Sequence, residues 1–312
     1  GLGNEAIVLT DTSLAATTLN TLNGNTTGVV NAETINTLTG AAAEVYTAYN
    51  SSGITGLGNE AISLSDTTID ASVLNTLNSN TTGLVTATAL AQISGTAAEL
   101  ITMYAADTAA TINISSNAIL AVTETITVAQ ANTLDAFTTG VVTATISTTS
   151  ISDLIGLTGT GNAYTITVAD TSVTAAALNT VNDATTVQVT ATAVEGISGT
   201  RAQLTTLYTA DGNNEINIDG DAKLTVSDSI THTQANVLDG KTSGAVTATI
   251  STTAIGDLDD LSGTGNAYTI TVATTQVTAA ALNTVNAATT VNVTATAVTS
   301  ITGTLAAMNT AY

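Results

Sequence analysis

The chain has 312 residues, and its 24 Asp and Glu against three Lys and Arg give a formal net charge of −21. A field of this sign repels nucleic acid and anionic lipid, so we expect neither as a partner. The sequence contains no Cys, which excludes disulfides and thiolate metal sites. It also lacks an apolar run of about 18 residues, so we expect no insertion into a membrane.

Strands are predicted where β-branched residues alternate with polar ones. These segments are residues 6–10, 29–33, 61–65, 84–88, 111–115, 120–123, 141–146, 164–168, 187–192, 215–218, 224–227, 245–250, 269–272 and 291–296. Because alternation fixes which face of a strand is buried, we expect one set of branched residues to point inward from a parallel sheet. This set is Val85, Val142, Ile166, Val189, Ile270 and Val293.

Short helices are predicted between these strands. Thr174 is a candidate N-cap of a helix in which Leu178 and Val181 lie three residues apart. A second helix type opens with a capping-box pattern, in which a Ser or Thr precedes an acid or Gln by three residues. This pattern occurs at Thr96 and Glu99, Thr200 and Gln203, and Ser150 and Asp153. A Leu before Asn or Asp marks one structural position six times, at Leu19, Leu74, Leu134, Leu178, Leu238 and Leu282.

The sequence is built from internal repeats. Residues 1–49 and 56–104 align at a shift of 55 with 28 of 49 positions identical, and residues 111–208 and 215–312 align at a shift of 104. Self-similarity at a fixed period is the signature of a repeat architecture. We therefore predict one continuous array that forms a single domain. Its units cover about residues 1–55, 56–110, 111–214 and 215–312.

The order of strand and helix fixes the expected fold class. One strand and one short helix return the chain to the same phase after about 23 residues, and such connected units form parallel sheets with right-handed crossovers. We predict an α/β fold, a right-handed repeat solenoid with parallel β-strands and short helices and about 23 residues per coil. A Rossmann-like domain is the competing α/β fold, and it is disfavoured because it needs unlike units and a switch point.

The two ends of the sequence fall close to one phase of the repeat. The final Tyr aligns with Tyr49, which is followed by six residues and then by the motif that opens the sequence. We interpret the chain as a fragment of a longer array. The alternative is a complete subunit whose terminal capping repeats have lost their distinct sequence. Terminal coils of an array expose an apolar layer and a strand edge. We therefore expect self-association end to end or within an array.

Three segments resemble a known group of proteins. GLGNEAI at residues 56–62, LSDTTIDASVLNTLNSNTTG at residues 64–83 and GTAAELITMYAA at residues 95–106 resemble the tandem repeats of giant cell-surface proteins of marine unicellular cyanobacteria. These include adhesin- or hemolysin-like proteins and the surface protein type associated with swimming without flagella. The resemblance implies an extracellular or cell-surface location. The GGxGxD nonapeptide of RTX calcium repeats is absent from the sequence, which puts calcium binding at defined repeat sites in doubt.

The sequence carries no pattern typical of an enzyme. Its one His, His232, has Val128 as its counterpart 104 residues earlier, so the repeat does not preserve it. The Gly-Thr-Gly segments at residues 159–161 and 263–265 are interpreted as tight turns that need positive φ. The sequence has no P-loop, no nucleophile elbow and no dinucleotide-binding motif. We therefore expect no catalytic residues, no cofactor-binding residues and no enzymatic activity.

Carboxylates are the most distinctive candidate ligands. One row follows the strands and consists of Asp11, Asp66, Glu124, Asp170 and Asp228, with Thr274 breaking the row. We expect this row to cap the following turn or helix, with calcium binding as the alternative. A denser cluster, in which calcium oxygens can converge, consists of Asp211, Asn213, Glu215, Asp219 and Asp221. Asp257, Asp259 and Asp260 form a second acidic group.

These observations favour a structural role. We predict an extracellular repeat protein that forms part of a cell-surface layer, a filament or an adhesin stalk. The alternative is a calcium-dependent adhesive or ice-binding module that uses the Thr-rich strand face. That face is indicated by Thr-Ala-Thr segments at residues 86–88, 143–145, 190–192, 247–249 and 294–296.

Overall fold

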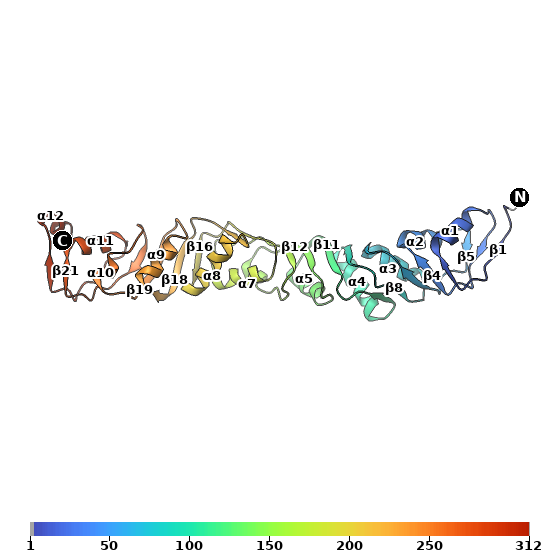
Figure 1. Ribbon diagram of the computed structural model, residues 1–312, viewed down its shortest axis with the longest axis horizontal. Coiled ribbons are helices and arrows are strands. Elements are labelled where there is room, and N and C mark those ends of the chain that lie inside the picture. The colour runs from blue at the N-terminus through green and yellow to red at the C-terminus, as the bar shows by residue number, and fades with distance from the viewer. Residues whose placement is uncertain (1–2, 312) are drawn as a thin grey trace. The chain divides into compact units, whose positions relative to one another are not determined.

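The computed structural model describes residues 3–311. The chain divides into two compact units. Unit 1 comprises Gly1–Ser147 and Gly161–Tyr164, and unit 2 comprises Thr148–Thr160 and Thr165–Tyr312. Within each unit the helices and strands follow one another in chain order (Figure 1). The predicted single continuous solenoid over residues 1–312 stays a prediction.

Unit 1 alternates short strands with short helices. Its elements are β1 (Ile7–Val8), β2 (Ser13–Ala15), α1 (Ala16–Gly24), β3 (Val30–Asn31), β4 (Thr37–Gly40), α2 (Ala42–Tyr49), β5 (Ile54–Thr55), β6 (Ala61–Leu64), β7 (Thr68–Asp70), α3 (Ala71–Asn80), β8 (Val85–Ala87), β9 (Gln92–Gly95), α4 (Ala97–Thr108), β10 (Ile112–Ile114), β11 (Ile119–Ile126), α5 (Val128–Asp135), β12 (Val142–Ile146) and most of β13 (Ala163–Thr165). No strand in this part of the described chain exceeds eight residues.

Unit 2 has the same alternation. Its elements are α6 (Ile151–Leu154), β14 (Ser172–Thr174), α7 (Ala175–Asp183), β15 (Val189–Ala191), β16 (Gly196–Gly199), α8 (Arg201–Gly212), β17 (Ile216–Ile218), β18 (Lys223–Ile230), α9 (His232–Asp239), β19 (Val246–Ile250), α10 (Ile255–Leu258), β20 (Ala267–Thr269), β21 (Gln276–Thr278), α11 (Ala279–Ala287), β22 (Ser300–Thr302) and α12 (Leu305–Ala311). Both units are therefore mixed α/β structures.

The strands form parallel sheets. The sheet orders in unit 1 are β1-β3-β5, β10-β8-β6-β4-β2 and β13-β12-β11-β9-β7, and those in unit 2 are β14-β16-β18-β19-β20, β15-β17 and β21-β22. Paired residues lie 24 positions apart at Leu14 and Leu38 and 27 apart at Ile93 and Leu120. They lie 20 apart at Ala248 and Tyr268. The predicted parallel α/β fold is confirmed, and these separations lie around the predicted period of about 23 residues.

The core of each unit consists mainly of Ala, Val, Leu and Ile side chains, with a few buried Tyr. Five of the six residues expected to point inward are at most 1% exposed, namely Val85, Val142, Ile166, Val189 and Ile270. The sixth, Val293, is partly exposed because it lies in the last coil of unit 2, where the described chain provides no further layer. The Leu position that recurs six times is at most 1% exposed except at Leu282, which lies in the same coil.

Nine short strands were not predicted. They are β2, β4, β5, β7, β9, β14, β16, β21 and β22. Most are three or four residues long and hold one or two apolar residues, too few for alternation to be recognised before the helix begins. Conversely, residues 291–296 form no strand but only an isolated parallel bridge between Thr294 and Thr271. The sequence therefore underestimates the number of strands in each coil.

The helices begin at the predicted caps, with one exception. Thr174 accepts from the Ala177 N–H, and the capping boxes at Thr96 and Thr200 are both complete. Two further boxes are present, at Thr127 and Thr231. The predicted box at Ser150 is wrong, because the Ser150 side chain makes no capping bond. The first N–H of that helix is capped by a residue of another coil, as described below.

Paired hydroxyl residues connect successive coils. Thr81 Oγ1 donates to the Glu60 carbonyl at 2.6 Å and accepts from the Gly83 N–H at 2.9 Å. The Thr82 N–H donates to the Gly58 carbonyl at 2.9 Å. A Cβ on Gly83 would lie 2.3 Å from the Glu60 carbonyl oxygen, so only glycine fits this approach. Other coils repeat the bond that Thr81 makes. In each, the first Thr of the hydroxyl pair donates to a carbonyl 20 or 21 residues earlier, namely Thr26, Thr138, Thr242 and Thr289.

Asn side chains connect successive helices. The Asn75 amide donates to the Glu99 carbonyl of the next helix at 3.0 Å. The helices α1, α7 and α11 make the same bond. In each of them an Asn amide donates to a backbone carbonyl 24 residues later, from Asn20, Asn179 and Asn283. Where Asp replaces this Asn, the side chain at this position accepts a hydrogen bond instead of donating one. Asp239 accepts from the Asn266 amide at 2.7 Å, and Asn266 Oδ1 accepts from the Val246 N–H at 2.8 Å.

The Gly-Thr-Gly segments are the tight turns that the sequence predicts. Gly161 has φ of 79°, and Gly263 and Gly265 each have φ of 83°. This left-handed backbone costs little for glycine and is unfavourable for other residues. The second turn leads directly to Asn266, which is 1% exposed. The turns therefore place a buried amide against the strand of the coil before.

Buried Tyr side chains make the stability of the fold sensitive to alkaline pH. Burial raises the pKa of Tyr208 to about 12 from its ordinary value of 10.0, and burial also raises the pKa of Tyr104. Between these pH values the unfolded chain loses a proton that the folded chain keeps. The stabilisation is therefore complete below pH 10 and is lost as the pH rises toward 12. Denaturant unfolding followed across this range should show a falling midpoint.

Two variants check the origin of this pH dependence. Tyr208→Phe should reduce it without removing it, because one buried phenol is lost while burial still raises the pKa of Tyr104, Tyr164 and Tyr268. Tyr46→Phe should leave it unchanged, because Tyr46 is 45% exposed. A midpoint that stays constant from pH 10 to about 12 in the unmodified protein would contradict the assignment.

Candidate functional site

The row of acidic side chains caps helices that belong to the coil before. Asp66 accepts from the Ala42 N–H at the start of α2, 2.8 Å away, and Asp228 accepts from the Arg201 N–H at the start of α8, 2.7 Å away. Glu124, Asp170 and Thr274 make the same contact to Ala97, Ile151 and Ile255. The predicted capping role is confirmed, but the expectation that the following turn or helix is capped is wrong.

We expect Asp66→Ala to lower the free energy of unfolding by about 1 kcal/mol, since it leaves a helix N–H without its acceptor. Asp11→Ala is the matched control, because the Asp11 carboxylate occupies the same repeat position without a hydrogen bond in the described residues. Its effect should stay within about 0.5 kcal/mol. Chemical denaturation measures both, and equal losses in the two variants would contradict the capping role.

The five predicted calcium ligands lie along one segment but in separate local contacts. Asp211, in the last turn of α8, accepts from the Ile218 N–H at 3.0 Å. Its repeat counterpart Asp107 makes the same bond to Ile114. Asn213 is the C-cap of α8 and donates to Glu215 Oε1 at 3.3 Å. Asp211 therefore has a structural contact that does not depend on a metal ion.

Asp219 and Asp221 lie in the turn between β17 and β18. The Asp221 N–H is 3.5 Å from Asp219 Oδ1, a long contact within the turn itself. Within residues 3–311 no three His, Cys, Asp or Glu side chains come together in a way that can hold a metal ion. Calcium binding at Asp211, Asn213, Glu215, Asp219 and Asp221 stays a prediction of the sequence.

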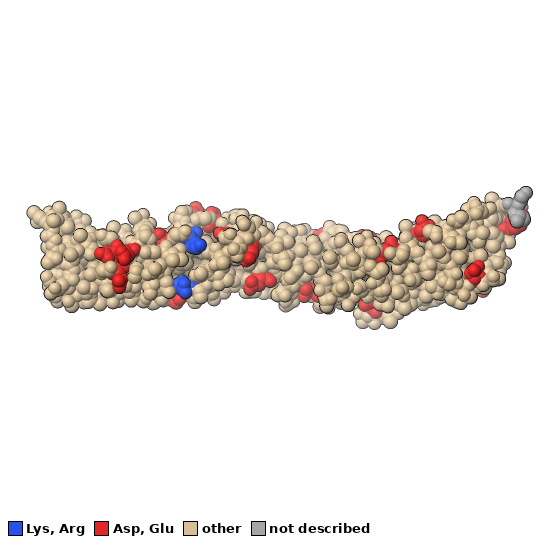
Figure 2. All heavy atoms as spheres, viewed as in Figure 1, with Lys and Arg blue, Asp and Glu red and all other residues tan. Residues whose placement is uncertain are grey.

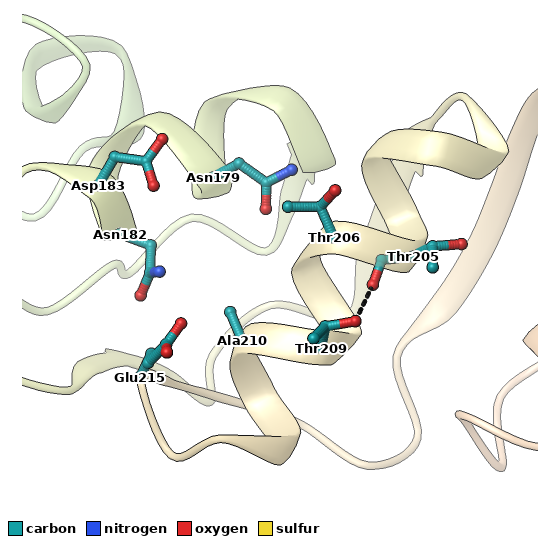
Figure 3. Close-up of a pocket in the computed structure, with 8 residues that line it drawn as sticks. All are labelled: Asn179, Asn182, Asp183, Thr205, Thr206, Thr209, Ala210 and Glu215. Atoms are coloured by element: carbon teal, nitrogen blue, oxygen red, sulfur yellow. Dashed lines mark hydrogen bonds between the residues drawn. The ribbon is translucent and has the colours of Figure 1, made fainter.

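One of the hollows in the described chain lies between α7 and α8. This pocket of about 290 Å³ is lined by Asn179, Asn182 and Asp183 of α7, by Thr205, Thr206, Thr209 and Ala210 of α8, and by Glu215. Figure 3 shows Asn182, Asp183 and Glu215 on one side and the three Thr on the other. Asn179 donates to Gln203 and Thr209 to the Thr205 carbonyl, so part of the lining is engaged in the fold.

Two carboxylates distinguish this pocket from its repeat counterparts. Asp183 corresponds to Ser79 and Ala287 in the copies 104 residues away, and Glu215 corresponds to Thr111. This difference from the two copies is the sequence signal that distinguishes Asp183. The lining offers carboxylate, amide and hydroxyl groups that can hydrogen-bond a polar solute in the open pocket.

On the face that Figure 2 shows, the acidic side chains do not form one continuous patch. Figure 2 shows Asp and Glu spread in small groups over the visible face, with uncharged residues between them. His232 lies at the first position of α9. Its Nδ1 lies 3.2 Å from Thr252 Oγ1 and its Nε2 lies 3.1 Å from Thr233 Oγ1. This His is thus engaged with hydroxyl groups at a helix start.

Comparisons with known proteins found no matching family model, no similar curated protein and no similar solved structure. Among the described residues, none of the helices has the length and apolar character needed to cross a bilayer. The case for a function therefore rests on the repeat and its contacts.

Proposed function

We propose that the chain is a right-handed repeat solenoid with a structural role in an extracellular surface layer, filament or adhesin stalk. The observation that carries this proposal is the recurrence of the same contacts between successive coils. Paired residues recur 20 to 27 positions apart, and the hydroxyl pairs, Asn bonds and acidic caps recur with them. In a solenoid each coil contacts only its neighbours, so length is added by adding coils.

The use of the polar groups supports a structural role over a catalytic one. Asp66, Glu124 and Asp228 accept from backbone N–H groups of neighbouring coils, and Asn20 and Asn75 donate to backbone carbonyls. Side chains that a binding or catalytic site would leave available are thus used to connect coils. We propose that the protein spans distance and presents a repeated surface.

The proposed location outside the cell rests on the resemblance to the tandem arrays of cyanobacterial cell-surface proteins. Antibodies raised against the purified chain test it on source cells. We expect them to label intact cells and to lose their target after brief external protease treatment, while an antibody to a cytoplasmic protein labels only permeabilised cells. Labelling that requires permeabilisation would contradict the proposal.

A further inference from the structure

A pocket of about 530 Å³ lies between α2 and α3, in the interior of unit 1 along the chain. Most of its lining is apolar, and a few polar groups lie among the apolar ones. Such a combination in a concave surface is typical of sites for small molecules. The lining includes Ala43, Tyr46, Asp66, Ser72, Val73 and Thr76.

Tyr46 places an aromatic ring where the other copies of the repeat have none. Its counterparts in the later copies are Ile101, Thr205 and Asn309. The coils of α4 and α8 therefore form the same parallel pairs without a ring at this position. Tyr46 is 45% exposed, so the ring is accessible at the pocket. The face of an aromatic ring attracts cations, including quaternary ammonium groups.

Asp66 brings a carboxylate to the same pocket. Its Oδ2 accepts from the Ala42 N–H at 2.8 Å, whereas its Oδ1 makes no hydrogen bond within residues 3–311. The three basic residues of the sequence are Arg201, Lys223 and Lys241, and all of them belong to unit 2. The carboxylate therefore has no Lys or Arg of its own unit as a partner, and its charge is available to a ligand.

The hydroxyl groups on the α3 side of the pocket already use their protons. Ser72 Oγ donates to Asp70 Oδ1, and Thr76 Oγ1 donates to the Ser72 carbonyl at 2.8 Å. These groups can accept further hydrogen bonds but cannot donate them. An anion would meet a carboxylate without a basic partner, so the lining disfavours anions and favours cations.

We propose that the pocket between α2 and α3 binds a small organic cation of the quaternary ammonium class. The methyl groups of such a cation pack against Ala43, Val73 and the ring of Tyr46. Its charge is balanced by Asp66 and attracted by the ring. The acidic surface of the chain raises the local concentration of cations. This binding activity goes beyond the structural role proposed above and does not depend on it.

Choline is the probe for this site in the full chain. Saturation-transfer NMR on its N-methyl signal gives the Kd at constant ionic strength. The neutral alcohol 3,3-dimethylbutan-1-ol has nearly the same shape without the charge, and we expect it to bind at least about fivefold more weakly. Phosphocholine carries the same group next to a phosphate, as a lipid headgroup does, and the acidic surface should weaken its binding. The absence of choline binding, equal binding of the alcohol, or tighter binding of phosphocholine would each overturn the proposal.

Substitutions in the lining locate the site. Tyr46→Leu keeps apolar bulk without the ring and should weaken choline binding at least about fivefold, whereas Tyr46→Phe should retain it. Asp66→Asn keeps an oxygen for the Ala42 N–H but removes the charge, so we expect at least about threefold weaker binding.

Glu124→Gln is the matched control for the loss of charge. Glu124 caps α4 as Asp66 caps α2, but the pocket of Tyr46 does not include it. Its substitution should leave the Kd for choline unchanged, and circular dichroism checks that each variant is folded. Unchanged binding in Tyr46→Leu, or equal weakening in Asp66→Asn and Glu124→Gln, would contradict a site at this pocket. Antibody labelling of cells is independent of choline binding, so the two proposals fail separately.

Discussion

Leu178→Ala is expected to lower the free energy of unfolding by roughly 2–5 kcal/mol. Leu178 lies in α7 and is fully buried. Truncation removes its apolar contacts and leaves a cavity that the neighbouring coils can only partly fill, because a closely packed interior relaxes incompletely. Chemical denaturation followed by circular dichroism measures the loss.

The repeat provides a matched control for this substitution. Leu282 occupies the same place in the copy 104 residues later, with the same neighbours in sequence, but is partly exposed. Leu282→Ala should therefore cost clearly less than Leu178→Ala, since less apolar surface returns to water. Equal losses would show that the last coil is as well covered as the inner ones and would contradict the burial difference.

Asn266→Ala is expected to cost about 3 kcal/mol, although the residue is small and polar. Asn266 is 1% exposed, its Oδ1 accepts from the Val246 N–H at 2.8 Å and its amide donates to Asp239 at 2.7 Å. The substitution leaves a buried N–H without a partner and removes a bond to a charged acceptor. Each of these losses costs about 1–3 kcal/mol.

Hydrogen exchange separates this mechanism from general loosening. The Val246 amide should exchange much faster in Asn266→Ala than in the unmodified protein, with smaller changes in amides of distant coils. Asn286→Ala, at an exposed Asn of α11, is the control and should stay within about 0.5 kcal/mol. A loss below about 1 kcal/mol for Asn266→Ala would contradict the role assigned to the buried amide.

Much of the fold could be predicted from sequence because the repeat and the strand period are local signals. The alternation at Val85 and Val189 correctly predicts the buried face, and Thr96 and Thr200 correctly predict helix starts. The direction of the acidic caps could not be predicted this way. Asp66 follows a strand in sequence, but its acceptor role depends on which helix the previous coil places beside it.

The candidate site was predicted less well than the fold. The density of acidic residues around Asp211 predicts a calcium site, yet the Asp211 carboxylate accepts from a backbone N–H in the same way as Asp107. The pocket between α7 and α8 combines Asp183 with Glu215, which lie 32 positions apart in sequence. Such a pairing follows from the stacking of two helices and leaves no local pattern.

The central claim is that each coil is held only by its neighbours through repeated contacts. Removing residues 111–214, one full period of 104 residues, tests it most directly. The junction joins Ala110 to Glu215 and preserves the local backbone, because Ala110 and Asn214, which precede the two copies, have φ of 57° and 61°. We expect a folded protein with one cooperative unfolding transition.

Removing residues 111–202 instead joins Ala110 to Gln203 inside α8, so that part of a helix replaces the strand that follows α4. This deletion should abolish cooperative unfolding because it breaks the strand register. Circular dichroism during thermal unfolding measures both shortened chains. The account predicts a cooperative transition for the in-phase deletion alone. The absence of such a transition after removal of residues 111–214 would contradict it.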